Sequence, residues 1–205
     1  MAFPFLTVFI IFIVWLAIRL RSVSGKRQQS DEDFWTQEKL ANATPARDID
    51  NLNYITIPLD KFPLHFSQNP DVVAMEDRLA ELSTHRLLNL TGKTNTELKA
   101  TYGVPNFNTM SQIGADFDEM TVLINSYAKA VIEELGLSQA QPILEFAVGI
   151  GTDVSESYEL LADCYKAAGN TTKLEYLQTQ VENSNLLLKE TILSHIGSST
   201  SDAAR

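Results

Sequence analysis

The chain has little of what a disulfide-bonded or nucleic-acid-binding protein needs. Its 205 residues include one cysteine, Cys164, which cannot form an internal disulfide and is compatible with a reducing compartment. Four of its 16 basic residues lie within the first 30 positions, which leaves 12 against 26 acidic residues. Because phosphate neutralisation needs lysine and arginine, we expect no nucleic-acid partner. A hydrophobic share of 44% still indicates a globular chain.

Motifs for phosphate, dinucleotide or acyl-transfer chemistry are also missing. Residues 91–94 (TGKT) resemble the end of a phosphate-binding loop, but Leu87 stands where that loop needs glycine. Residues 149–151 (GIG) lie between two predicted helices and not after a strand, which excludes a dinucleotide fingerprint. The sequence contains no Gly-x-Ser-x-Gly. We expect ordinary turns at both glycine-containing positions.

The titratable residues do not form a recognisable site either. Three acids cluster on a predicted helix, where we expect a solvated face and no calcium loop: Asp116, Asp118 and Glu119. The histidines His65, His85 and His195 are far apart in sequence and form no metal-ligand pair, so we expect structural roles for them. Cys164 is flanked by core positions, which predicts an inert thiol. The sequence therefore predicts no catalytic, cofactor-binding or metal-binding residue, no cofactor and no enzymatic activity.

A long hydrophobic run occupies the N-terminus. Residues 2–18 (AFPFLTVFIIFIVWLAI) have no charge, and with Arg19–Arg21 they form a predicted helix long enough to span a bilayer. A cleavable signal peptide is the main alternative. It needs basic residues before the run and a small-residue cleavage site after it, and neither is present. We therefore predict a transmembrane anchor at residues 1–21, with residues 2–21 contacting the lipid bilayer.

The basic residues beside this anchor all lie on its C-terminal side. They are Arg19, Arg21, Lys26 and Arg27. The positive-inside rule then predicts a single-pass protein of the cell membrane, with the N-terminus outside and residues 22–205 in the cytoplasm.

Past the anchor, the sequence predicts a polar linker and then a helical domain. The linker covers residues 22–33. Residues 34–69 predict a short helix and an irregular stretch, in which Asn53–Ile57 is an extended segment packed on helices. Asn69, followed by Pro70 and Asp71, is a typical helix start, and Thr94-x-x-Glu97 is a capping box.

Helical periodicity dominates the remaining chain. One apolar stripe has spacings of three and four residues and ends at Gly136; its members are Ile113, Phe117, Met120, Ile124, Tyr127, Val131 and Leu135. Ser138 opens the next predicted helix, and another stripe runs from Val154 to Tyr165. A last helix would hold Leu174 through Ile192, before a disordered tail at residues 197–205. The predicted fold class is all-α, with the helical domain over residues 70–196.

An internal repeat is visible in this domain. Residues 121–154 align without a gap with residues 155–188, at the 34-residue period of tetratricopeptide repeats. Ala128 then matches Ala162, and Ile143 matches Leu177. The second unit departs from the pattern at Leu174 and Gln178. Two tetratricopeptide-like helical hairpins are one interpretation, and an ordinary helical bundle is the other.

Several short segments carry a resemblance to a known group. They are Ala41–Thr44, Leu52–Asp60, Asn89–Gly92, Tyr102–Gly103, Leu144–Glu145 and Gly151–Val154. With these segments the chain resembles uncharacterised single-pass membrane proteins of low-GC Gram-positive bacteria, over most of residues 34–196. The resemblance implies a bacterial cell membrane and brings no activity with it.

These observations lead to one functional hypothesis and two alternatives. Stacked helical hairpins present a concave surface that binds peptides or partner proteins, so we expect a membrane-anchored interaction or scaffold module with an unidentified protein partner. A structural subunit of a larger membrane complex would instead expose a large apolar patch. An enzyme with an unrecognised site would bring titratable groups together in a pocket.

Overall fold

The computed structural model describes residues 33–198 and divides the chain into two compact units. The first unit contains the chain up to Ile49 together with Thr94–Asn108, and the second contains Asp50–Lys93 and everything from Thr109 onward. Over the described residues the regular elements are all helices, which confirms the all-α class for that range. The predicted anchor at residues 1–21 and the linker before Asp33 lie outside it. None of the helices within residues 33–198 is both long and apolar enough to cross a bilayer.

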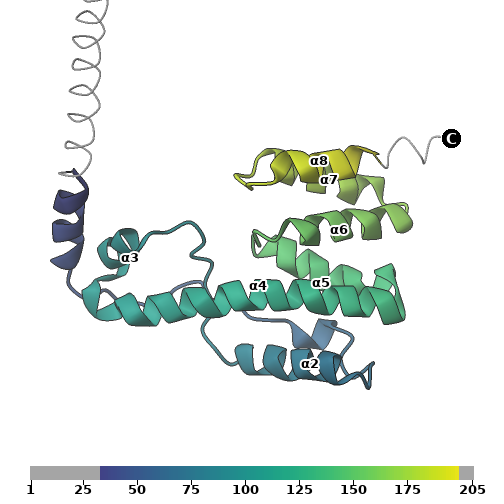
Figure 1. Cartoon of the computed structure of the whole chain (residues 1–205), viewed down its shortest axis with the longest axis horizontal. Coiled ribbons are helices and arrows are strands. Elements are labelled where there is room, and N and C mark those ends of the chain that lie inside the picture. Colours follow the sequence, from purple (N-terminus) through teal and green to yellow (C-terminus); the bar gives the residue numbers. More distant parts are fainter. Residues whose placement is uncertain (1–32, 199–205) are drawn as a thin grey trace, which may run out of the picture. The chain divides into compact units, whose positions relative to one another are not determined.

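The described part of the first unit contains two short helices (Figure 1), which polar contacts join. Residues 33–42 are helical, and α3 (Asn95–Tyr102) is followed by the 3-10 turn η2 (Val104–Asn106). The predicted capping box is confirmed: the Glu97 amide donates to Thr94 Oγ1, and the Thr94 amide donates to the Glu97 carboxylate at 2.7 Å. Glu38 links the two helices by accepting from Lys99 Nζ at 2.5 Å and from the Thr96 hydroxyl at 2.6 Å.

Gly103 lets the chain after α3 approach the segment at residues 44–47. Its φ of 88° lies in the left-handed region that favours glycine. A Cβ at Gly103 would lie 2.1 Å from the carbonyl oxygen of Pro45, which no side chain could tolerate. The Arg47 amide donates to the Tyr102 carbonyl at 3.1 Å, and the Val104 amide donates to Thr44 O at 3.2 Å. Only glycine permits this backbone contact.

The second unit begins with an extended segment that leads to η1 (Leu59–Lys61) and α2 (Pro70–Leu82). The predicted helix start is confirmed, since Asn69 Oδ1 accepts from the Asp71 amide at 3.0 Å. The predicted extended segment is also confirmed: Ile55 pairs with Leu87 in an isolated bridge, and Ile57 is buried.

Helix α4 (Phe107–Leu135) is the longest element of the described chain, with 29 residues. The predicted apolar stripe is buried from Ile113 to Val131, but Leu135 at the end is 40% exposed. The helix begins six residues before the first residue of that stripe, so its N-terminal bound was not apparent from the apolar pattern. Figure 1 shows α2 and α5 on opposite sides of α4 within the second unit.

Four shorter helices complete this unit: α5 (Leu137–Gly149), α6 (Ser155–Ala167), α7 (Thr171–Glu182) and α8 (Lys189–Ser198). Helix α6 packs against α5, α7 and α8, and α7 also packs against α8. Figure 1 shows α6 between α5 on one side and the overlapping α7 and α8 on the other. A glycine of positive φ stands two residues after the end of each of α5 and α6: Gly151 and Gly169. The following amides, of Thr152 and Asn170, bond back to Ala147 O and Tyr165 O, as in a Schellman motif.

The prediction of one continuous last helix through Leu174 and Ile192 is wrong. Helix α7 ends at Glu182, and α8 begins at Lys189. The break contains Asn183-Ser184-Asn185, whose side chains compete for backbone groups; the Ser184 hydroxyl donates to Val181 O at 2.7 Å. Leu188 is consequently 52% exposed and not part of a buried stripe. Helix α8 reaches Ser198, into the predicted tail, whose last seven residues lie outside the described range.

Helix starts and buried positions recur at a spacing of 34 residues. Leu137 and Thr171 begin α5 and α7, while Ser155 and Lys189 begin α6 and α8. The buried residues match across this offset in the pairs Ile124–Tyr158, Tyr127–Leu161, Ala128–Ala162, Val131–Tyr165, Ala140–Leu174, Ile143–Leu177 and Ala147–Val181. The same offset takes Tyr158 to Ile192 and Ala162 to Ile196, both buried in α8.

Candidate interaction groove

The two motif-like glycine segments are turns, as predicted. Gly92 has a φ of 80° in the turn that precedes the Thr94 cap of α3. Gly149 is the last residue of α5, and Gly151 follows it with a φ of 74°. The Asn89 amide donates to the Gly151 carbonyl at 2.9 Å, which ties this turn to the chain after α2. Both segments have structural roles.

The prediction of a solvated acidic face is wrong for Asp116. This residue is 6% exposed, and its carboxylate lies 2.8 Å from His85 Nδ1 and accepts from Gln112 Nε2 at 2.7 Å. The sequence contained a usable signal, because Asp116 sits three residues after Ile113 and so shares the buried side of α4. Asp118 lies away from this pair, and partial burial, with the charge of Asp153 nearby, raises the pKa of its carboxyl group.

The three histidines remain separate, and each lies against a carboxylate. His65 Nδ1 is 3.3 Å from Glu76, His85 contacts Asp116, and His195 Nε2 is 2.9 Å from Asp163. Within residues 33–198 there is no group of three or more His, Cys, Asp or Glu side chains placed to hold a metal ion.

Cys164 is buried in α6, as its core-flanked position predicted. Its Sγ donates to Leu137 O at 3.2 Å. Burial raises the pKa of its thiol to about 11, so the reactive thiolate is scarce at neutral pH.

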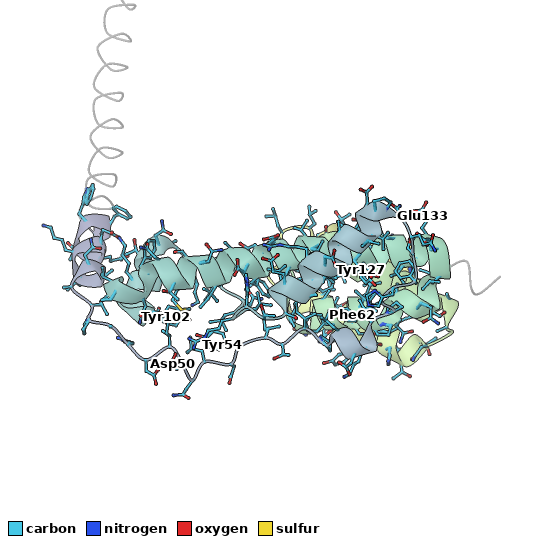
Figure 2. All side chains as sticks on the ribbon, turned by 90° about the horizontal axis from the view of Figure 1, so that it is seen from below. Asp50, Tyr54, Phe62, Tyr102, Tyr127 and Glu133 are labelled. Carbon is cyan, nitrogen blue, oxygen red and sulfur yellow. The ribbon has the colours of Figure 1, made fainter. Side chains whose placement is uncertain are left out.

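Glu76 is a buried carboxylate that sequence reasoning did not identify. It is 6% exposed and accepts from the His65 amide at 2.9 Å and from the Tyr127 hydroxyl at 3.0 Å. That hydroxyl also lies 2.8 Å from Pro63 O, and burial raises the Tyr127 pKa. The network fastens the segment before α2 onto α4, near Phe62 and Tyr127 in Figure 2. Glu76 lies four residues after buried Val72, on the same side of α2.

A groove runs between α5 and α7 over α6. It consists of two adjoining hollows of about 460 and 450 Å³ that share Val148, Tyr176 and Gln180. The first hollow is also lined by Tyr158, Thr179, Asn183 and Ser184. The second is also lined by Glu145, Gly149, Leu161, Tyr165, Lys173 and Leu177. We call this surface the α5–α7 groove.

Tyrosines and amides give the groove its chemical character. Tyr176 is 65% exposed, and its hydroxyl accepts from Gln180 Nε2 at 3.2 Å. Tyr158 is almost fully buried and donates to Thr152 O at 2.9 Å, so only part of its ring faces the groove. Amides beside aromatic rings can hydrogen-bond an extended backbone while the rings pack against its side chains.

One end of the groove holds an ionic cluster around Glu145. Its Oε1 accepts from Lys173 Nζ at 2.7 Å and from the Tyr165 hydroxyl at 3.1 Å, while Gln141 donates at 2.9 Å. Partial burial acts to raise the pKa of Glu145, but these hydrogen bonds outweigh it and hold the pKa below its usual value. Lys173 also lies 5.5 Å from the centre of the Tyr165 ring. The cluster fixes the side chains at this end of the groove.

Comparisons with models of known protein families, with curated proteins and with solved structures gave no match for this chain.

Proposed function

We propose that this chain is a membrane-anchored interaction module that binds an extended segment of a partner protein in the α5–α7 groove. The observation that carries the proposal is the groove itself. Its two adjoining hollows are lined by exposed Tyr176 and by the side-chain amides of Gln180 and Asn183. Each of these amides has a second N–H besides the one that it donates within α7. Titratable groups do meet in the groove, but Glu145, Lys173 and Tyr165 are hydrogen-bonded to one another, which favours a structural cluster over an enzyme site.

A tetratricopeptide-like array is the finer fold that we propose for residues 121–198. The 34-residue recurrence of helix starts and buried positions supports it, and Ala128 and Ala162 are both 0% exposed where close helix approach needs a small residue. The recurrence extends into α8, so this helix would begin a third, incomplete unit. A terminal helix of this kind covers the apolar face that the last full unit would otherwise expose.

The anchor is proposed from the sequence. Residues 2–21 would span the cell membrane once, and the basic residues that follow would keep the helical units on the cytoplasmic side. A reporter fused after Arg205 tests this orientation. We expect cytoplasmic reporter activity, and activity only outside the cell would reverse the topology.

Site-specific photo-crosslinking in the full-length, membrane-bound chain tests the groove. Gln180 and Gln178 form a matched pair: both are exposed glutamines of α7, but only Gln180 lines the groove. A benzophenone amino acid at position 180 should yield a discrete adduct of one partner, and the same residue at position 178 should not.

A second variant makes that result specific. Tyr176→Ala removes the exposed ring of the groove and should abolish the adduct at position 180 while leaving the helical circular dichroism unchanged. Equal adducts at both positions, or adducts that survive Tyr176→Ala, would contradict groove binding.

A further inference from the structure

Three large apolar side chains are exposed on the first helix of the first unit. Phe34 is 51% exposed, Trp35 is 59% exposed and Leu40 is 68% exposed. The two aromatic rings pack edge to face, with their centres 5.4 Å apart. We call Phe34, Trp35 and Leu40 the aromatic patch. Leu40 lies about two turns further along the same helix and adds a separate exposed apolar side chain. Exposed apolar side chains of this size mark surfaces that contact another phase or molecule.

Leu40 also lines a shallow hollow beside the helix, which Phe34 and Trp35 do not line. This hollow has a volume of about 290 Å³ and lies between residues 33–42 and α3, both in the first unit. Leu40, Ala41 and Ala100 line it with methyl groups, together with Thr44 and Thr96. The apolar surface is therefore wider than the three side chains alone.

Charge distinguishes the first unit from the rest of the chain. Its described residues include three lysines and arginines against four aspartates and glutamates, while residues 50–93 and 109–198 include 8 against 19. Glu38, on the helix of the patch, is neutralised by Lys99 at 2.5 Å. Three acids, Asp31, Glu32 and Asp33, stand directly before Phe34, and the basic residues Lys26 and Arg27 precede them. An anionic lipid surface would repel the second unit strongly, whereas the charges of both signs beside the aromatic patch largely offset one another.

The position of the patch in the chain places it close to the proposed anchor. Twelve residues, 22–33, separate Arg21 from Phe34. Twelve residues span at most about 43 Å, whatever their conformation. The patch is thus held at high effective concentration over the headgroup layer of the membrane in which the anchor sits. Between the two, Lys26 and Arg27 attract an anionic surface beside the anchor, and the three acids at residues 31–33 oppose this attraction nearer the patch.

We propose that the aromatic patch inserts into the interfacial layer of the lipid bilayer that holds the anchor. The inference rests on the proposed anchor. Tryptophan and phenylalanine rings partition into this layer, where an indole keeps its N–H hydrated while its ring leaves water. The first unit would then contact the membrane surface, and the second unit would bind the partner protein.

The two tryptophans of the chain allow the anchor and the patch to be tested separately. They are Trp15, in the predicted anchor, and Trp35, in the patch. The full chain is reconstituted into phosphatidylcholine–phosphatidylglycerol vesicles that contain a nitroxide lipid labelled either near the headgroup or deep in the acyl chain. In Trp15→Phe, Trp35 emission should be quenched about twofold more by the shallow label than by the deep label, and iodide should reach Trp35 poorly. In Trp35→Phe, either label should quench Trp15.

Each other outcome has a defined meaning. Trp35 that is open to iodide and unaffected by both labels overturns the inference while leaving the anchor intact. Trp35 that is shielded from iodide yet unquenched is covered by protein, either a second copy or a partner, and this also overturns it. Trp15 that escapes both labels overturns the anchor itself, and the inference with it.

A third tryptophan provides the control. Tyr176→Trp, in a chain with both native tryptophans replaced by phenylalanine, puts an indole at a site with a comparable exposure of 65%. It should remain open to iodide and unquenched. Quenching equal to that of Trp35 would show that tethering alone brings any exposed ring to the lipid, and the inference would fall. Phe34→Ser with Leu40→Ser, in Trp15→Phe, should increase iodide access to Trp35.

Discussion

The two units of this chain are held together by different forces. Of the 31 buried hydrophobic residues within 33–198, the second unit contains 29, and the described part of the first unit contains Ala41 and Leu98. The first unit depends instead on the Glu38 contacts, the Thr94 capping box and the backbone approach at Gly103. Apolar burial is the dominant stabilising term in folding, so the second unit should unfold cooperatively and the first should open locally at lower cost.

The largest expected effect comes from emptying part of the second unit's core. Leu177 in α7 is 1% exposed and belongs to the apolar core cluster. Leu177→Ala should lower the free energy of unfolding by about 2–5 kcal/mol, because it loses burial and leaves a cavity. Urea unfolding of the detergent-solubilised full chain measures this. Leu187→Ala is the matched control, since Leu187 is 98% exposed and the change should stay within about 0.5 kcal/mol. Similar costs for the two would refute the assigned core.

The first unit should break at Gly103. Gly103→Ala places a Cβ against the Pro45 carbonyl and forces an unfavourable φ, at an expected cost of about 1–3 kcal/mol or more. Hydrogen exchange should show the loss in residues 33–49 and 94–108, with protection of α5–α7 unchanged. Gly149→Ala is the control, because its Cβ would meet nothing within 4 Å and the helix tolerates alanine. A loss of protection that spreads through the core would mean that the units unfold together.

If residues 121–154 and 155–188 are repeats, the same substitution at Ala128 and at Ala162 should cost a similar free energy of unfolding. Ala128 and Ala162 are both 0% exposed and 34 residues apart. Leucine at either position should overpack the helix contact and cost about 1–3 kcal/mol, with similar values at the two sites. Ala167→Leu, at an exposed position of α6, should change the free energy of unfolding by less than about 0.5 kcal/mol. A large cost at one alanine and none at the other would favour an ordinary bundle over repeated units.

Sequence reasoning was most successful where a local rule decides the structure. The caps at Asn69 and Thr94 and the stripe of α4 follow from neighbouring residues, and all were predicted. It failed where distant contacts decide. Asp116 was assigned to solvent because its partner His85 is 31 residues away, and Glu76 was overlooked because its partner Tyr127 is 51 residues away. A polar residue on the buried side of a helix needs a partner, so both positions could have been flagged.

The candidate groove was outside the reach of sequence for a similar reason. Val148, Tyr176 and Gln180 come from two helices, and nothing in their spacing reveals that they share a surface. The break at Asn183–Asn185 was readable from its turn-forming residues, but the apolar residues at 186–188 concealed it. Because of that break, α8 is a separate helix that packs back against α6 and α7.

The smallest expected effect concerns the polar contacts that both units contain. Glu145 in the groove and Glu38 in the first unit each accept from a lysine, and both have a lowered pKa. In Glu145 burial opposes the shift and the hydrogen bonds from Lys173, Gln141 and Tyr165 outweigh it, whereas in Glu38 the Lys99 hydrogen bond is the largest cause. A carboxyl group whose folded pKa is lowered stabilises the protein above its unfolded pKa, and this stabilisation is lost as the pH falls through the folded pKa. Glu145→Gln should therefore be less stable than the natural chain near neutral pH, and the difference should vanish in acid, below the usual carboxyl range. In a Lys173→Met background the same substitution should show a much smaller dependence on pH, because the cation that favours the carboxylate is gone. Urea midpoints measured across that pH range for the natural chain, the two single variants and the double variant test this prediction.

Glu38→Gln should follow the same pH trend in the hydrogen exchange of the first unit alone, while the urea midpoint of the core stays constant. A pH-independent difference for Glu145→Gln would mean that the groove cluster contributes to stability only through packing. Of these two ionic contacts, only that of Glu38 would then stabilise its unit, and the two units would differ even more than the structure suggests.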